Sequence, residues 1–288
     1  MTGATTATKT MHAIVYDKYG PPEVLDYRRV DRPSARAGQV LIQMEAAGVN
    51  PAEWHMMTGT PFLVRFMAGL RTPKTGRLGL DIAGTIVEVG QGVTRHNVGD
   101  RVYGAARGSY AEYVPAEADR VNPLPASMTI EQGGGVAIAA ITALQGLRDK
   151  LHVAAGNHVL INGASGGVGT FAIQIAKLMG AEVTAVCSGR NADLVRSVGA
   201  DHVIDYTTTD LITSEHRYDA LFDNVGSHSL WHYRKVLNPK ARVVMVGGKK
   251  DLPLGPLPGM FKMFAQSVVI SQKAGMFVAD ENAADLAV

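Results

Sequence analysis

The stretch that decides the fold of this chain is Asn162-Gly163-Ala164-Ser165-Gly166-Gly167-Val168-Gly169. It follows an apolar, β-branched run at 158–161, which predicts a buried strand, and precedes residues 171–179, whose apolar positions have helical spacing. The last three glycines of the loop allow a tight turn and a close approach of backbone to a ligand. Free N–H groups at the start of the helix favour a bound phosphate. With a second strand at 182–187, this order predicts a dinucleotide-binding site; the alternative is an ordinary Gly-rich turn.

The end of the second predicted strand favours NADPH over NADH as the cofactor. NAD enzymes usually place an Asp or Glu there on the ribose 2′-hydroxyl, whereas NADP enzymes favour Arg or similar donors that accept the 2′-phosphate. The chain offers the hydroxyl of Ser188 and the guanidinium of Arg190, with no carboxylate before Asp193. A guanidinium makes a bidentate, charge-assisted pair with a phosphate. The alternative is that Arg190 is an ordinary solvated loop charge.

The remaining sequence predicts an antiparallel, barrel-like domain over 1–125 and an α/β domain over 126–288. In the first domain, β-branched runs at 11–16, 39–46, 82–90 and 109–114 predict strands that glycines punctuate. Pro123 and Pro125 predict a joint, and a single helix is expected over 130–147. In the second domain, strands are expected at 158–162, 182–187, 202–205, 219–223, 242–246 and 268–272, with helices at 191–198 and 228–237 among the connections. This alternation is typical of a doubly wound parallel sheet.

Composition excludes several classes of function. The chain is 46% hydrophobic and 19% charged, as in globular proteins, and its net charge of +2 gives no attraction to nucleic acid or to an anionic membrane. The single cysteine excludes an intrachain disulfide and a Cys-based zinc cluster. Residues 1–10 are polar and Thr-rich, unlike a signal peptide, and Lys262 and Lys273 interrupt the apolar stretch 260–278. We therefore expect a cytoplasmic protein with a small-molecule substrate, and neither a nucleic acid nor a membrane as partner.

Five ordered segments carry a resemblance to a known family: residues 46–51, 79–90, 98–104, 164–169 and 223–226. They resemble the medium-chain dehydrogenase/reductase superfamily, in its zinc-independent, NADPH-dependent quinone oxidoreductase branch. The resemblance implies a GroES-like β-barrel catalytic domain followed by a Rossmann domain, with the active site in the cleft between them. It also implies a homodimer formed through the sixth predicted strand, around 268–271.

The resemblance further implies a reaction that needs no zinc. In zinc-dependent relatives the catalytic ligands are a Cys where this chain has Asn50, and a His-Glu pair where it has Leu80-Asp81. Leucine cannot ligate a metal, and Asn is a poor zinc ligand beside Cys or His. The lobe that carries four cysteines in those relatives is also missing. The hypothesis is hydride transfer from NADPH to a quinone or an α,β-unsaturated carbonyl, which hydrogen-bond donors polarise.

Specific site residues follow from the same resemblance. Asn50 is expected near the nicotinamide and the substrate, and Thr142 at the nicotinamide end; His55 is a candidate proton donor or substrate contact. Tyr206 is expected to flank the adenosine, and the residues expected to line the cofactor groove are Asn224, Val225, Gly226, Val246, Gly247 and Gly248. The alternatives are that Asn50 is a turn residue before Pro51, that His55 is a structural or surface histidine, and that 247–248 is an ordinary loop.

The end of the chain bears on these expectations. Relatives continue past the position of Val288 with a helix and strands that return to the catalytic domain. We therefore expect residues 281–288 to be the beginning of that helix, and the chain to be truncated at its C-terminus. The residues expected to bind the cofactor are all present, whereas catalysis depends partly on the missing segment. The alternative is therefore a truncated, catalytically weak NADPH-binding protein that acts by interaction. A zinc alcohol dehydrogenase is a third hypothesis.

Overall fold

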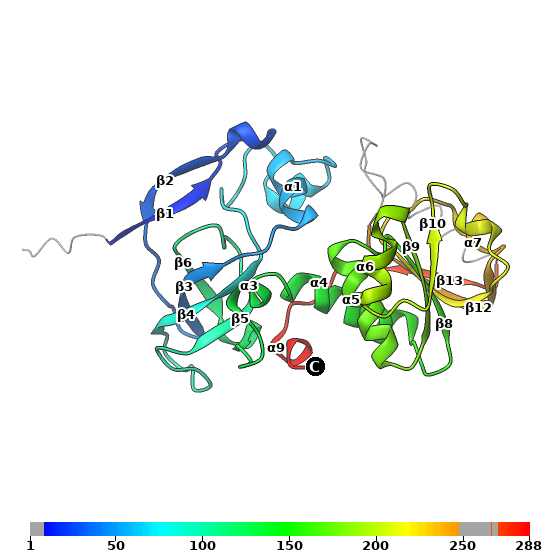
Figure 1. The fold of residues 1–288 in the computed structure, drawn as a ribbon. Coiled ribbons are helices and arrows are strands. Elements are labelled where there is room, and N and C mark those ends of the chain that lie inside the picture. Colours follow the sequence, from blue (N-terminus) through cyan, green and yellow to red (C-terminus); the bar gives the residue numbers. More distant parts are fainter. Residues whose placement is uncertain (1–8, 248–265, 267–269) are drawn as a thin grey trace, which may run out of the picture. The chain divides into compact units, whose positions relative to one another are not determined.

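Two compact units make up the part of the chain that this computed structural model describes, which is residues 9–247, 266 and 270–288 without the side chain of Met67. Unit 1 comprises the chain up to Ile138 together with Glu281–Val288, and unit 2 comprises Ala139–Asp280 (Figure 1). This division differs from the expected one, which placed the boundary at Pro125 and assigned residues 126–288 to one domain.

Packing explains where the boundary falls. Helix α3 (Ile130–Gly133) packs against the strands of unit 1. It comes so close that a Cβ added at Gly133 would lie 3.1 Å from the Cβ of Tyr103. The final helix, α9 (Ala283–Leu286), belongs to the same unit, since Asn122 Nδ2 donates to the carbonyl of Ala283 (2.6 Å). Both helices therefore complete unit 1 although a second unit separates them in the sequence.

Unit 1 is built on an antiparallel sheet with the strand order β6-β3-β4-β5-β7. These strands are β3 (Gln39–Ala46), β4 (Asp81–Val89), β5 (Arg101–Ala105), β6 (Tyr113–Glu117) and β7 (Val121–Pro123), and β1 (Thr10–Val15) with β2 (Asp26–Asp31) forms a separate pair. The core of the sheet consists of fully buried aliphatic side chains such as Val40, Ile42, Ile82 and Ile86. The predicted strands 11–16, 39–46 and 82–90 are confirmed to within one residue.

Two predictions for unit 1 are wrong. The strand expected at 109–114 lies at Tyr113–Glu117, and it runs through Pro115 because β6 is an edge strand, where a missing N–H is tolerated. The single helix expected over 130–147 is divided into α3 and α4 (Ala137–Gln145), followed by a π-helical turn at Gly146–Leu151. The break comes at Gly134, where the backbone approaches Ala46 so closely that a Cβ would lie 2.9 Å from its carbonyl carbon. The short helices α1 (Pro51–Thr58) and α2 (Val64–Ala68) complete the unit's main elements.

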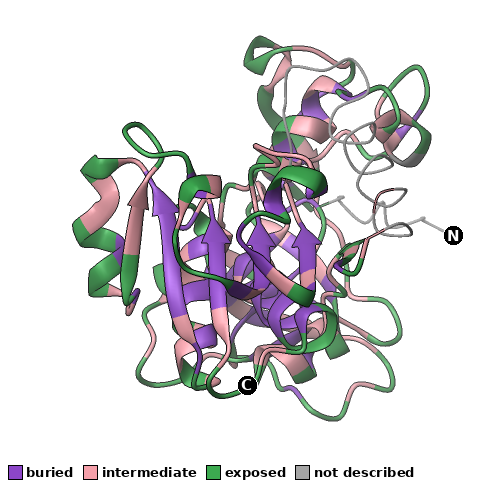
Figure 2. Ribbon diagram, turned by 90° about the vertical axis from the view of Figure 1, so that its right-hand side faces the viewer, coloured by how far each residue is buried: buried purple, intermediate pink, exposed green. Residues whose placement is uncertain are grey.

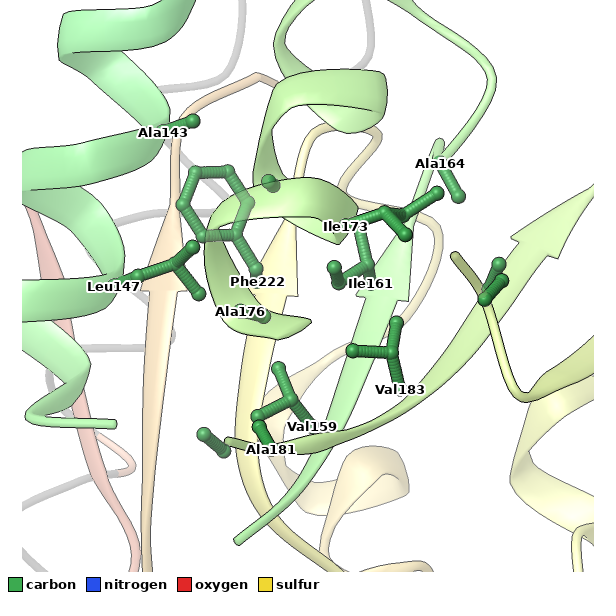
Figure 3. Packing of buried hydrophobic residues seen from close by; sticks show 14 of the residues in the cluster. Ala143, Leu147, Val159, Ile161, Ala164, Ile173, Ala176, Ala181, Val183 and Phe222 are labelled. Atoms are coloured by element: carbon green, nitrogen blue, oxygen red, sulfur yellow. The ribbon is translucent and has the colours of Figure 1, made fainter. Parts of the chain in front are cut away.

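Unit 2 is the expected doubly wound domain, with a parallel sheet of order β10-β9-β8-β11-β12-β13. Its strands are β8 (His158–Asn162), β9 (Glu182–Cys187), β10 (His202–Asp205), β11 (Tyr218–Asp223), β12 (Leu237–Met245) and β13 (Lys273–Met276), and its helices include α5 (Gly167–Leu178), α6 (Ala192–Ser197) and α7 (Leu230–Tyr233). The central strands are almost entirely buried (Figure 2). Helices α5 and α6 cover one face, where Ile173 and Ala176 pack against Ile161 and Val183 (Figure 3). Leu230 and Tyr233 of α7 pack on the opposite face.

Three elements of unit 2 differ from the predictions. The strand expected at 242–246 is β12, which begins five residues earlier, at Leu237. The sixth strand is Lys273–Met276 rather than 268–272: residues 270–272 form a bend, and 268–269 lie outside the described residues. Ile270 packs into the core and Gln272 donates to the carbonyl of Asn238 (3.1 Å), so strand pairing with β12 begins only at Lys273. The helix expected at 228–237 is confined to Leu230–Tyr233, because β12 already begins at Leu237. Among the helices of the described residues, none combines the length and the hydropathy of a membrane span.

Candidate functional site

The glycine loop lies between β8 and α5, at the carboxyl end of a central strand. Gly163 has a φ of 76°, and its N–H and that of Ala164 both donate to the carbonyl of Val186 on β9. The loop then turns back, with the N–H of Gly166 donating to Gly163 O, and α5 begins at Gly167. The N–H groups of the first helical turn have no acceptor within the helix. The loop therefore presents backbone donors at the positive end of a helix dipole, as the sequence predicts.

The glycines of this loop serve two different purposes. A Cβ at Gly169 would lie 2.6 Å from the carbonyl oxygen of Ala164, so this glycine allows the helix to pack against the loop. A Cβ at Gly167 would have no heavy atom within 4 Å, so here the bare backbone faces open space. That open, side-chain-free surface fits a pyrophosphate, which needs close access to backbone N–H groups.

Ser188, Arg190 and Asn191 form a second group of donors after β9. Arg190 is exposed and has no ion-pair partner in the described part of the chain. Asn191, which sequence reasoning missed, donates from Nδ2 to Ser165 Oγ (3.0 Å) and to Ser188 Oγ (3.3 Å). The glycine loop and the residues after β9 are therefore joined by one amide. Tyr206 follows β10 at the same end of the sheet, is exposed, and donates its N–H to Cys187 O.

A carboxylate lies beside this second group, which corrects the premise that none is near. Asp205 ends β10 and pairs in register with Cys187, so its side chain lies against Gly189. It accepts hydrogen bonds from Thr207 Oγ1 (2.7 Å) and Thr207 N (2.9 Å), which hold the pKa of its carboxyl below the usual range. Sequence reasoning missed Asp205 because it considered only the residues that follow the strand directly. Its place at the end of the neighbouring parallel strand is the signal that would have revealed it.

Residues expected to line the cofactor groove meet between β8 and β11, where the strand order reverses. In open α/β sheets, ligands bind outside the carboxyl ends of the strands at this reversal. Asn224 donates from N and Nδ2 to the carbonyl of Asn162, and a Cβ at Gly163 would lie 2.8 Å from Cγ2 of Val225. The N–H of Val246 donates to Asp223 O (2.9 Å), which brings the end of β12 to the same place. Gly248 lies outside the described residues, and Thr142 is buried within α4.

A buried carboxylate fixes the loop after β11. Asp223 is fully buried, and its Oδ1 accepts from Asn162 Nδ2 (2.9 Å) and from the N–H groups of Val225 (3.0 Å) and Gly226 (2.9 Å). Its Oδ2 accepts from Tyr233 Oη (2.7 Å). Burial and the charge of Asp223 raise the pKa of Tyr233 far above its usual value, so the phenol keeps its proton. The hydrogen bonds of this carboxylate therefore fix Val225 and Gly226, two of the expected groove residues.

Unit 1 contains a second polar cluster around Asn50. Asn50 precedes α1 and donates from Nδ2 to Asp81 Oδ2 (2.7 Å), while its backbone N–H donates to Glu53 Oε2 (2.7 Å). Asp81 also accepts from the N–H of Ile138 (2.8 Å). Asn50 is thus part of a helix N-terminus, as the turn alternative implies, and is also held between two buried carboxylates.

Burial dominates the electrostatics of this cluster. It raises the pKa of Glu53 and of Asp81, in each case against hydrogen bonds that lower it. Tyr110, which donates to Gly48 O (3.1 Å), has its pKa raised to about 12 by burial and by the charges of Glu53 and Asp81. In the folded unit all three groups therefore lose their protons at a higher pH than free side chains do.

His55 makes its hydrogen bond within its own loop. It lies in the last turn of α1, and its Nδ1 makes a 2.7 Å hydrogen bond with the carbonyl of Thr60. The backbone N–H of Thr60 in turn donates to His55 O. These two bonds close the loop after α1, which favours the structural alternative for His55.

The positions that hold zinc in relatives do not supply a ligand set here. The amide of Asn50 donates to Asp81, both oxygens of Asp81 already accept N–H bonds, and Leu80 has no ligating atom. Throughout residues 9–247, 266 and 270–288, no three His, Cys, Asp or Glu side chains cluster so as to hold a metal ion.

Replacing Asn50 with Asp is expected to make unit 1 strongly pH-dependent in stability. A third carboxylate would face Asp81 and Glu53, and all three pKa values would rise in the folded state above their unfolded values near 4. The folded state would then bind more protons, so stability falls as pH rises above about 4. We expect thermal unfolding of Asn50→Asp to show its largest loss, about 2–4 kcal/mol, at pH 7, with recovery towards pH 5. Asn50→Ala, which adds no charge, should show much less recovery; equal pH profiles would contradict the argument.

The fold and the loop define a class: a doubly wound dinucleotide-binding domain joined to an antiparallel β unit. Comparison with known families agrees, because residues 36–126 match the alcohol dehydrogenase GroES-like domain and residues 167–279 match the zinc-binding dehydrogenase family. The chain is 34% identical over 283 residues to a chloroplast envelope quinone oxidoreductase homolog of Arabidopsis thaliana, covering 93% of this chain and 82% of that protein. A chloroplastic quinone-oxidoreductase homolog of Spinacia oleracea is 36% identical over 214 residues, which is 70% of this chain but only 63% of that protein's length.

Solved structures lead to the same family. A quinone oxidoreductase from Coxiella burnetii superposes with a TM-score of 0.83 at 30% identity, covering 97% of this chain and 86% of that one. The Escherichia coli quinone oxidoreductase complexed with NADPH superposes with a TM-score of 0.78 at 25% identity, covering 93% and 81%. The chain therefore belongs to the medium-chain dehydrogenase/reductase superfamily, in its quinone oxidoreductase-like branch, and its GroES-like and Rossmann domains are confirmed.

Proposed function

We propose that this protein is an NADPH-dependent reductase of quinones or α,β-unsaturated carbonyls. The observation that carries the proposal is the open backbone surface at Gly167 together with the exposed guanidinium of Arg190, which has no ion-pair partner among the described residues. Backbone N–H groups suit a pyrophosphate, and a guanidinium without an internal partner suits a 2′-phosphate. The NADPH complex of the Escherichia coli relative supports a nicotinamide cofactor.

The proposal gives a role to each of the expected cofactor-binding residues and to Asn50. The loop 164–169 holds the pyrophosphate, Ser188 and Arg190 hold the 2′-phosphate, and Tyr206 flanks the adenosine. The carboxyl ends of β11 and β12, at 224–226 and 246–248, line the rest of the groove, and Thr142 lies at the nicotinamide end. When bound, the reduced nicotinamide supplies the hydride. Asn50 is the proposed substrate contact in unit 1, held by Asp81 and Glu53; a proton-donor role for His55 is not part of the proposal.

The proposed reaction needs no zinc, and the donor set at Asn50, Leu80 and Asp81 supports this part of the proposal. A reduced quinone takes its protons from water, so the site needs orientation and hydrogen-bond donors more than a metal or an acid–base pair. Metal analysis of active, purified protein tests the point. Stoichiometric zinc whose removal abolishes activity would favour a zinc alcohol dehydrogenase instead.

Steady-state oxidation of NADPH with a panel of quinones and enones tests the function itself. Acceptor-dependent oxidation supports the reductase. Tight NADPH binding without any acceptor-dependent oxidation would favour the alternative, a catalytically weak NADPH-binding protein that acts by interaction.

Arg190→Ala is expected to weaken the binding of NADPH much more than the binding of NADH. Loss of a charge-assisted phosphate contact costs roughly 1.5–3 kcal/mol, which corresponds to about 10-fold to about 150-fold in the dissociation constant. Only NADPH has the 2′-phosphate, so the NADH dissociation constant should stay nearly unchanged. Arg196→Ala is the matched control, because Arg196 is an exposed arginine of the same unit that already pairs with Asp193 (3.3 Å). Equal losses for both cofactors in Arg190→Ala would refute the assignment.

Assembly and location complete the proposal. We propose a homodimer in which a second copy pairs along β13, the strand that ends the parallel sheet, and sedimentation velocity tests it. A cytoplasmic location stays a prediction from the sequence, since the names of the spinach and Arabidopsis relatives place those proteins in the chloroplast.

A further inference from the structure

We propose that Asn191 is a positioning residue that aims the hydroxyl protons of Ser165 and Ser188 at the phosphates of the cofactor. The inference rests on the proposed NADPH-binding function and adds a residue to it that determines how two of the donors point. Asn191 itself need not touch the cofactor in this arrangement.

The chemistry of the contacts sets the direction of the protons. Asn191 Nδ2 lies 3.0 Å from Ser165 Oγ and 3.3 Å from Ser188 Oγ. An amide nitrogen only donates, and it carries two hydrogens, one for each serine. Both hydroxyl oxygens therefore act as acceptors towards Asn191, and each hydroxyl proton points away from it. Neither hydroxyl donates to another group within the described residues, so both protons are available to a ligand.

The local backbone holds Asn191 in this position. Its N–H donates to the carbonyl of Ser188 (2.9 Å), which closes the turn Gly189–Asn191 directly after β9. Ala192 then begins α6, and this helix packs into the core through the fully buried Val195. The amide is thus attached to rigid structure on both sides, as a positioning group requires.

The two serines occupy different parts of the proposed site. Ser165 lies in the glycine loop, where the pyrophosphate common to NADH and NADPH is expected. Ser188 lies beside Arg190, where only the 2′-phosphate of NADPH is expected. A neutral amide changes no charge at either place, so its contribution is one of direction. Loss of the Asn191 side chain should consequently weaken the binding of both cofactors, and the binding of NADPH more than that of NADH.

The test is a set of dissociation constants for NADPH and NADH, measured by fluorescence titration of the full chain. The proteins are the wild type, Asn191→Ala, the double variant Ser165→Ala/Ser188→Ala, and the triple variant that combines them. We expect Asn191→Ala to weaken NADPH about tenfold and NADH about threefold. In the background without the two serines, Asn191→Ala should change neither constant, because the protons that it orients are gone.

Each outcome has a clear reading. A purely structural effect of Asn191→Ala lowers both affinities by one factor and leaves their ratio unchanged, which would overturn the proposal; the ratio does not depend on the folded fraction. An undiminished loss in the triple variant would show direct contact of Asn191 with the cofactor and would also overturn it. If the wild type binds NADPH but Asn191→Ala binds equally well, only this inference fails. If the wild type does not bind NADPH, the proposed function fails with it.

Discussion

Gly169→Ala is expected to destabilise unit 2 and to abolish tight NADPH binding. The added Cβ would lie 2.6 Å from the carbonyl oxygen and 2.7 Å from the carbonyl carbon of Ala164, both backbone atoms that cannot rotate away. Helix α5 must therefore move off the glycine loop, at a cost of about 3 kcal/mol in the free energy of unfolding. Differential scanning calorimetry and NADPH titration measure the two effects.

Gly167→Ala is the matched control, in the same turn of the same helix. Its Cβ would meet no heavy atom within 4 Å, so the free energy of unfolding should be preserved. The same methyl group would enter the space proposed for the pyrophosphate, so NADPH and NADH should both bind more weakly. Stability lost equally in the two variants would contradict the distinction between a packing glycine and a ligand-facing one.

Asp223→Leu is expected to have the largest effect on stability in unit 2. Leucine leaves Val225 N and Gly226 N without the Oδ1 acceptor, and leaves Asn162 Nδ2 with only its longer bonds to Ser227 Oγ (3.1 Å) and Tyr233 Oη (3.3 Å). It also removes the acceptor of Tyr233 Oη. Each unsatisfied buried donor costs about 1–3 kcal/mol, and partial relaxation leaves a total of about 4–5 kcal/mol. Chemical denaturation followed by the far-UV circular dichroism of the whole chain measures the loss.

Asp223→Asn separates shape from charge at the same position. The amide oxygen can accept the bonds made to Oδ1, and its nitrogen can donate to Tyr233 Oη in place of accepting from it. We expect a loss of about 1–2 kcal/mol. A loss as large as that of Asp223→Leu would mean that the negative charge, rather than the number of acceptors, holds the loop after β11.

The first three strands of the parallel sheet, in chain order, could be predicted from the sequence because their signals are local. Residues 158–162, 182–187 and 202–205 are apolar runs with clear boundaries, and the structure confirms all three bounds. The sixth strand, Lys273–Met276, contains Gly275 and no β-branched residue, so only its pairing with β12 makes it a strand. The strand was predicted at 268–272 instead, because that segment contains β-branched residues.

The candidate site shows the same limit. The loop 164–169 can be recognised from its glycine content, and its geometry agrees with the prediction. Asp205 and Asn191 cannot be recognised from composition. Their positions depend on the register between parallel strands and on one side-chain rotamer. Asn50 was recognised, but its bond to Asp81 joins residues 31 positions apart and follows from the packing of β4 against the start of α1.

The return of the last residues to unit 1 has a consequence for how the molecule is made. Tyr103 Oη donates to Leu286 O, and Arg120 pairs with Glu281, across 183 and 161 residues of sequence. During translation the first unit therefore lacks these contacts until the whole second unit has been synthesised. Residues 139–280 are contiguous and can fold as soon as they leave the ribosome. Vectorial synthesis should therefore allow the contiguous second unit to fold first, and the first unit gains its contacts with residues 281–288 only afterwards.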